Sequence, residues 1–327
     1  MATRRALTAF LLAALAGGAQ KPAGSPKEDE PATIKVDVDV VNLLCSVRDR
    51  KGALISTLGK DDFQVLEEGK EQSIKYFSRE TDLPLTLGLL VDVSGSQERL
   101  IAEERQAAYQ FFQQVLRKKD VAFLISFGSD AELLQDLTGS PSLLQKGLEG
   151  LRVIGGVGGL HPGPVPTAGQ PRGTVLYDAV YLAATDRLQS EVGRKAMILI
   201  TDGVDQGSRL KLSEAIEAAQ KANAIVYSIY YVDAAMYYRG GFGGPSDSAL
   251  KRMSEETGGR MFRVDRKNTL SQIFQQIQDE MRSQYSIGYT SADSRQPGQF
   301  RKVDVKTRNR DLKVQARKGY YVVGSGG

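Results

Sequence analysis

Four continuous apolar runs, separated by segments with a helical repeat, constrain the fold of this chain more than any other feature. The runs cover residues 85–91, 121–127, 196–200 and 224–230. Because they are apolar on both faces, they are typical of strands buried inside a parallel sheet. Strands that alternate with helices in this way predict a doubly wound α/β domain, with a mostly parallel sheet and helices on both faces.

The segments between the runs carry apolar residues at helical spacing. One stripe consists of Leu100, Ile101, Ala108, Phe111, Phe112 and Val115, and another of Leu176, Ala179, Val180 and Ala183. Further helices are expected over residues 213–222, 246–257 and 270–281. The α/β domain is therefore predicted to occupy residues 83–283.

Alternating apolar and polar residues predict strands on both sides of this domain. Residues 34–47 alternate with a change of phase at Val40 and Val41, which indicates a bulge or bend, and turn residues follow at 49–52 and 68–69. The same alternation returns after residue 284, with a turn over residues 308–311.

Neither β segment alone has enough strands for a stable core. We therefore expect residues 34–82 and 284–327 to pair into one small β-sandwich, with the α/β domain inserted between them. Two separate β appendages that pack on the α/β domain are the alternative.

The first 19 residues have the composition of a secretory signal peptide. Arg4 and Arg5 precede an apolar stretch over residues 6–15, and small residues follow at 17–19. The apolar stretch is too short to span a bilayer. Residues 20–33 are rich in proline and charge and are expected to form a flexible linker. The sequence predicts an exported protein, periplasmic or extracellular, with no membrane span in the mature chain.

Composition excludes several classes of site. Hydrophobic residues make up 41% of the 327 residues and charged residues 25%, and the net charge of +4 is spread over interspersed signs. No basic stripe interleaved with aromatic residues suggests a nucleic acid partner. Cys45 is the only cysteine and His161 the only histidine, so an intramolecular disulfide and any site with two histidines are excluded.

Oxygen-bearing side chains gather where two of the apolar runs end. Asp92, Ser94 and Ser96 follow the first run, Asp202 follows the third, and Thr174 opens a helical segment after a Gly-rich loop. The carboxyl ends of neighbouring parallel strands meet at one edge of a sheet, where ligands bind. Carboxylate and hydroxyl oxygens suit a hard divalent cation such as Mg²⁺.

This set resembles the metal-ion-dependent adhesion site of von Willebrand factor type A domains, in residue order and in setting. The resemblance covers residues 83–281. It implies that Ser94, Ser96 and Thr174 bind Mg²⁺ directly, that Asp92 and Asp202 act through water, and that Mn²⁺ or Ca²⁺ also fits. It further implies a non-catalytic protein that captures a protein partner through an acidic side chain of that partner.

The flanking stretches "LPLTLGLLVDVSGS" and "ILITDGVDQGSR" resemble a secreted bacterial family, the VWFA-related Acidobacterial domain. "KDDFQVLEEGKEQSIKYF" near the amino end and "FRKVDVK" near the carboxyl end resemble the same family. Gln97 stands where many relatives carry methionine, and it provides no ligand.

Two loops are expected to flank the site, over residues 155–173 and 231–244. Their partner-binding candidates are His161, Tyr237, Tyr238 and Phe242. Local packing of these aromatic residues within a Gly-rich loop is an equally good interpretation.

Other interpretations of the same residues stay open. The hydroxyls of Ser94, Ser96 and Thr174 can cap helices and Asp202 can belong to a turn, which would leave a site that no longer binds metal. A hydrolase could use Ser94 or Ser96 with His161 and Asp202, or a metal ion, but no Gly-x-Ser-x-Gly motif is present. A structural role in an envelope assembly would instead use the β-sandwich as the contact surface.

Overall fold

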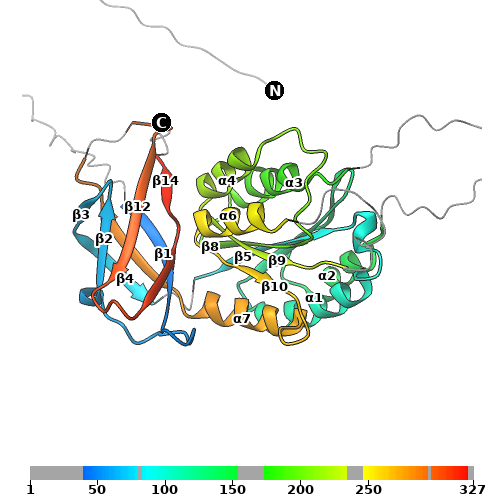
Figure 1. The fold of residues 1–327 in the computed structure, drawn as a ribbon, viewed down its shortest axis with the longest axis horizontal. Coiled ribbons are helices and arrows are strands. Elements are labelled where there is room, and N and C mark those ends of the chain that lie inside the picture. The colour runs from blue at the N-terminus through cyan, green and yellow to red at the C-terminus, as the bar shows by residue number, and fades with distance from the viewer. Residues whose placement is uncertain (1–39, 80–82, 154–172, 234–245, 294–295, 323–327) are drawn as a thin grey trace, which may run out of the picture. The chain divides into compact units, whose positions relative to one another are not determined.

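The computed structural model describes residues 40–79, 83–153, 173–233, 246–293 and 296–322. The expected signal peptide, the expected linker and the alternating residues before Val40 lie outside these ranges. Within them, the chain forms one six-stranded sheet and two four-stranded sheets (Figure 1).

The six-stranded sheet has the order β10-β9-β8-β5-β6-β7. Its strands are β5 (Leu85–Asp92), β6 (Val121–Phe127), β7 (Ala131–Thr138), β8 (Arg194–Thr201), β9 (Ala224–Tyr230) and β10 (Met261–Arg263). All neighbouring strands are parallel except β6 and β7. The predicted mostly parallel sheet is thereby confirmed, with one antiparallel edge strand.

Helices cover both faces of this sheet (Figure 1). On one face lie α1 (Ile101–Val115), α2 (Pro141–Glu149) and α7 (Leu270–Arg282). On the other lie α3 (Leu176–Leu182), the π-helical turn η3 (Ala183–Leu188), α4 (Leu212–Lys221) and α6 (Ser248–Thr257). Because both faces are covered, all eight residues of β5 are buried, as its unbroken apolar sequence predicts.

The two smaller sheets take strands from both ends of the described chain. One has the order β13-β1-β11-β4 and the other β14-β12-β2-β3. From the amino-terminal segment come β1 (Val40–Arg48), the 3₁₀ turn η1 (Lys60–Asp62), β2 (Phe63–Glu67), β3 (Lys70–Gln72) and β4 (Ile74–Arg79). From the carboxyl-terminal segment come β11 (Tyr285–Thr290), β12 (Phe300–Thr307), β13 (Lys313–Ala316) and β14 (Gly319–Tyr321).

Both sheets combine strands of the two segments, which alternate in the first sheet and meet at a single pair of strands in the second. In the first sheet β1 lies between β13 and β11, and in the second β2 pairs with β12. Consecutive strands β12 and β13 belong to different sheets. The inward-facing residues of both sheets, including the thiol of Cys45, form one apolar core.

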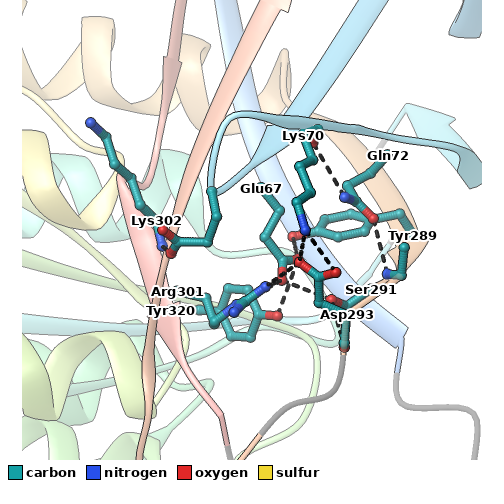
Figure 2. A network of polar contacts seen from close by, with 11 residues as sticks. Glu67, Lys70, Gln72, Tyr289, Ser291, Asp293, Arg301, Lys302 and Tyr320 are labelled. Carbon is teal, nitrogen blue, oxygen red and sulfur yellow. Dashed lines mark hydrogen bonds and ion pairs between the residues drawn. The ribbon is translucent and has the colours of Figure 1, made fainter.

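A buried carboxylate joins the two sheets of this sandwich (Figure 2). Glu67 at the end of β2 is fully buried and accepts hydrogen bonds from Arg301 Nε at 2.9 Å and Tyr289 Oη at 2.7 Å. Ser291 donates to it at 2.7 Å and Tyr320 at 3.3 Å. Burial opposes ionisation of Glu67, but the hydrogen bonds from these donors outweigh it and hold its pKa below the usual value.

A second buried carboxylate connects the sandwich to the α/β domain. Glu280 of α7 is fully buried and pairs with Arg48 of β1 and with Arg260 at 3.3 Å. Ser46 of β1 donates to the same carboxylate at 3.2 Å. The side chain of Glu280 thus contacts both the sandwich and the α/β domain.

No helix in the described ranges is both long enough and apolar enough to cross a membrane.

Candidate functional site

The site lies where the strand order of the large sheet changes direction. From β5 the chain moves outward to β6 and β7, and then returns to the other side of β5 with β8. Ligands of open α/β sheets bind at the carboxyl ends of the strands at such a switch point. Asp92 ends β5, and Asp202 follows Thr201 at the end of β8, so both carboxylates reach this position.

Asp92 is fully buried and fixed by two hydrogen bonds. One carboxylate oxygen accepts from the backbone N–H of Ser94 at 2.9 Å, and the other from the hydroxyl of Thr201 at 2.6 Å. Burial, together with the nearby charge of Asp202, raises the pKa of Asp92 to about 7. The site therefore concentrates more negative charge than it can stabilise by itself.

Three further oxygen atoms form a short chain beside Asp92. The hydroxyls of Ser94 and Ser96 lie 3.0 Å apart, and the Ser96 hydroxyl donates to Asp202 Oδ2 at 2.6 Å. Ser94 occupies the cap position of the 3₁₀ turn η2 (Gly95–Gln97), yet its side chain makes no capping hydrogen bond. Its hydroxyl is directed towards Ser96, so simple helix capping does not account for this serine.

The loop that carries Asp202 depends on a glycine. Gly203 has a φ of +78°, which other L-residues rarely adopt, and a Cβ there would lie 2.2 Å from the carbonyl oxygen of Ser246. Asp202 Oδ1 accepts from the backbone N–H of Val204 at 3.1 Å. The turn holds one carboxylate oxygen and leaves the other for Ser96.

Thr174 lies at the same edge of the sheet and is buried. The next residue, Val175, donates its N–H to the carbonyl of Gly128 just after β6, and the carbonyl of Thr174 accepts from Gln206 at 3.1 Å. Among the described residues, no hydrogen bond joins its hydroxyl to the aspartate–serine cluster. The structure thus brings Asp92, Ser94, Ser96 and Asp202 together, and places Thr174 near them by its backbone.

Two polar residues of this region have no counterpart in the sequence prediction. Thr201 donates a hydrogen bond to Asp92. In the sequence, the only indication of this role is a hydroxyl residue at the end of an apolar run. Glu104 of α1 is fully buried, and neither carboxylate oxygen has a hydrogen-bond partner in the described part of the chain. Burial, with the charges of Asp92 and Glu103, raises the pKa of Glu104 well above its usual value.

The donor set fits a hard cation. All of its side-chain donors are oxygen atoms, and a positive ion between Asp92 and Asp202 would relieve the repulsion that raises the pKa of Asp92. Over the described ranges, no group of three or more His, Cys, Asp or Glu side chains is placed to hold a metal ion. A site here would instead combine two carboxylates with hydroxyls.

The partner-binding candidates His161, Tyr237, Tyr238 and Phe242 lie outside the described residues. Their contribution stays a prediction.

Several solved structures align with this chain at low identity. They include BatB from Bacteroides thetaiotaomicron (19% identity, TM-score 0.45, 60% of this chain and 97% of that one). A von Willebrand factor type A protein from Catenulispora acidiphila also aligns (12% identity, TM-score 0.48, 83% of this chain and 76% of that one). Proximal thread matrix protein 1 from the mussel byssus, with a zinc-occupied metal-ion-dependent adhesion site (MIDAS) motif, aligns as well (11% identity, TM-score 0.48, 67% of this chain and 50% of that one).

No curated protein matches the chain. The family model of the von Willebrand factor type A domain matches residues 167–276, a span that includes Thr174 and Asp202. The sheet order, the helices on both faces and this match agree with one another. The chain therefore carries a von Willebrand factor type A domain.

Proposed function

We propose that this chain is an exported, non-catalytic binding protein that captures a protein partner through a divalent cation. Asp92, Ser94, Ser96, Thr174 and Asp202 would hold the cation, and Mg²⁺ is the best match for neutral hydroxyl and carboxylate oxygens. The bond between Ser96 and Asp202 carries the proposal, because it joins the loops after β5 and β8 at the switch point.

The roles of the individual residues follow from their surroundings. Both oxygens of Asp92 already accept hydrogen bonds, from Ser94 N–H and Thr201, so this carboxylate suits an indirect role through water. The hydroxyls of Ser94 and Ser96 are only partly buried and suit direct ligation. A bound cation supplies a position for an acidic side chain of the partner.

Hydrolysis by a Ser-His-Asp triad fits the geometry less well. In a triad the serine hydroxyl contacts an imidazole, which in turn contacts the carboxylate. Here Ser96 donates directly to Asp202 at 2.6 Å, which leaves no place for an imidazole between them.

Calorimetric titration of Mg²⁺ into the metal-stripped chain, residues 20–327, tests the site. We expect saturable binding to one site, lost in Asp92→Ala and retained in Asp61→Ala, which removes an exposed carboxylate of the sandwich. Titration with Mn²⁺ and Ca²⁺ ranks the ions. A folded wild-type protein that binds none of them would refute the metal site.

Partner capture needs a separate test. We expect retention of the partner in Mg²⁺ to be lost in EDTA and in Ser96→Ala. Retention that survives both changes, but is lost on deletion of residues 284–327, would favour the structural role in which the sandwich is the contact surface.

A further inference from the structure

A cavity of about 420 Å³ lies at the opposite edge of the large sheet from the candidate metal site. The parallel strands β8 and β9 begin beside it, with Lys195 and Ala224 in its wall. Residues of β1 and of the segment around β14 form the other wall. A cavity of this volume, between two structural units, is typical of small-ligand sites.

Arg317 is one of the charged residues that line the cavity. Its Nη1 donates to the side chain of Asn223 at 2.6 Å, and its Nη2 to the backbone carbonyl of Asn42 at 2.8 Å. The guanidinium also lies over the ring of Tyr320, 5.5 Å from the ring centre. These contacts hold the side chain in place on both sides of the cavity without neutralising its charge.

The guanidinium has spare donor capacity. An arginine carries five N–H donors, and the contacts with Asn223 and Asn42 use two of them. Nε is shielded from solvent and has no acceptor in the described part of the chain, and no carboxylate there pairs with Arg317. Burial lowers the pKa of Arg317 to about 10. Arg317 is partly buried. A partly desolvated cation without a counter-ion is unfavourable, so an anionic ligand would be stabilised here.

The rest of the lining defines the body of such a ligand. Lys195 and Lys221 also line the cavity, and Glu191 is the single acidic residue among the described lining residues. Both ammonium groups already have partners, because Lys221 pairs with Glu217 at 2.7 Å and Lys195 donates to the carbonyl of Leu188 at 2.8 Å.

Apolar side chains complete the wall: Val40, Val192, Ile225, Tyr321 and Val322. The side chain of Val192 is 79% exposed at this position. Polar side chains also line the cavity: Asn42, Gln220, Asn223 and Thr257. The lining therefore combines a basic group with a mixed polar and apolar surface.

We propose that this cavity binds a small ligand that carries a carboxylate beside an apolar group and a polar group, and that the Arg317 guanidinium donates to the carboxylate. Such a group can come from a free organic acid or from the carboxyl terminus of a peptide. The inference does not depend on the metal site, because the two positions lie at opposite edges of the sheet.

Binding of N-acetyl-leucine and of N-acetyl-leucinamide to the chain of residues 20–327 tests the proposal. Calorimetry in EDTA excludes a carboxylate bound to metal at the other edge. We expect the acid to bind saturably and the amide at least about tenfold more weakly, because hydrogen bonds to a charged acceptor are the stronger ones. The tripeptide Gly-Val-Leu, with a free or an amidated carboxyl end, distinguishes the two sources: tighter binding than N-acetyl-leucine identifies a peptide terminus, and equal or weaker binding a free acid.

Two variants and one control make the outcome decisive. Arg317→Met and Val192→Asp should each weaken the binding of N-acetyl-leucine at least about tenfold. Val192 has an exposed side chain, so its substitution should leave the fold intact. Arg310→Met, at an exposed arginine of the β12–β13 turn, should leave the affinity for N-acetyl-leucine unchanged. Equal binding of acid and amide, no binding to the folded wild type, or full binding to a folded Arg317→Met variant would overturn the proposal.

Discussion

Asp92 illustrates how a binding residue can lower the stability of its own fold. Its folded-state pKa of about 7 lies above the ordinary value of 3.8, so the folded chain binds this proton more tightly than the unfolded chain. Stability is therefore lost as the pH rises from about 4 to about 7, where the unfolded chain releases the proton first. The charge that suits a cation is costly without one.

Asp92→Asn removes this cost. In EDTA at pH 8 we expect the variant to be more stable than the wild type by more than about 1 kcal/mol, because each pKa unit corresponds to 1.36 kcal/mol. At pH 5 the difference should shrink, since the wild-type carboxyl is then protonated. Urea unfolding at both pH values measures it, and equal stability at pH 8 would contradict the explanation.

Gly203 permits a second prediction at the residue scale. Gly203→Ala should destabilise the fold by more than about 1 kcal/mol, because it adds a clash with the Ser246 carbonyl to the strain of a positive φ. Gly52→Ala is the matched control, since Gly52 has a φ of +88° but nothing within 4 Å of its Cβ position. Similar losses in thermal unfolding would mean that the clash contributes nothing.

The sequence predicted the aspartate–serine cluster because its members follow apolar runs in a recognisable spacing. Thr201 and Glu104 could not be found in that way. A hydroxyl at the end of a buried strand has no periodicity, and a glutamate among Glu103, Glu104 and Arg105 looks like part of a solvated helix face. Only the tertiary packing of α1 buries it.

At the scale of elements, segments with strong periodicity were predicted to within two residues. The expected helix over residues 270–281 is α7 (Leu270–Arg282), and that over residues 246–257 is α6 (Ser248–Thr257). The edge strand β7 was not predicted, because each of its residues is exposed or half-buried and its sequence has no alternation. Two further elements have too few apolar residues for a recognisable pattern in the sequence. They are helix α2, with three buried residues, and strand β10, which is three residues long.

The contact between α7 and β1 predicts a large effect of one substitution. Glu280→Ala should destabilise the protein by about 3–5 kcal/mol, because Arg48 and Arg260 would lose the buried carboxylate they share. Asp279→Ala changes the exposed neighbour and should have a small effect. Chemical denaturation of both variants measures the difference, and comparable losses would show that the buried pairing contributes little.

For the whole molecule, the sandwich depends on a carboxylate from one end of the chain and donors from the other. Glu67→Gln should cost about 1.5–3 kcal/mol at pH 6, because the buried Arg301 loses its charged hydrogen-bond partner at 2.9 Å and, among the described residues, keeps only Asp293, at 3.3 Å. The lowered pKa of Glu67 means that its contribution is present above the unfolded-state pKa and is lost as the pH falls below it.

Urea unfolding at pH 6 and pH 3.5 checks both parts of this prediction. The wild type should lose more stability on acidification than Glu67→Gln. Glu71→Gln, at an exposed position of β3, serves as the control. Parallel losses in wild type and Glu67→Gln would exclude Glu67 as the titrating group.

The fold class could be predicted from the sequence because two different periodicities divide the chain. The partner of each strand could not be predicted, because alternation shows which face of a strand is buried but not which strand lies beside it. The domain limits at residues 34–82, 83–283 and 284–327, and the signal peptide over residues 1–19, stay predictions.

The shared sandwich also sets an order of events during synthesis. Glu67 and Arg301 are 234 residues apart along the chain. Strands β1 to β4 therefore emerge from the ribosome long before β11 to β14 exist to pair with them. Contacts this distant in sequence form slowly, and unpaired strand edges are prone to aggregation. The amino-terminal strands of a newly made chain thus lack their partners until β11 to β14 have been made.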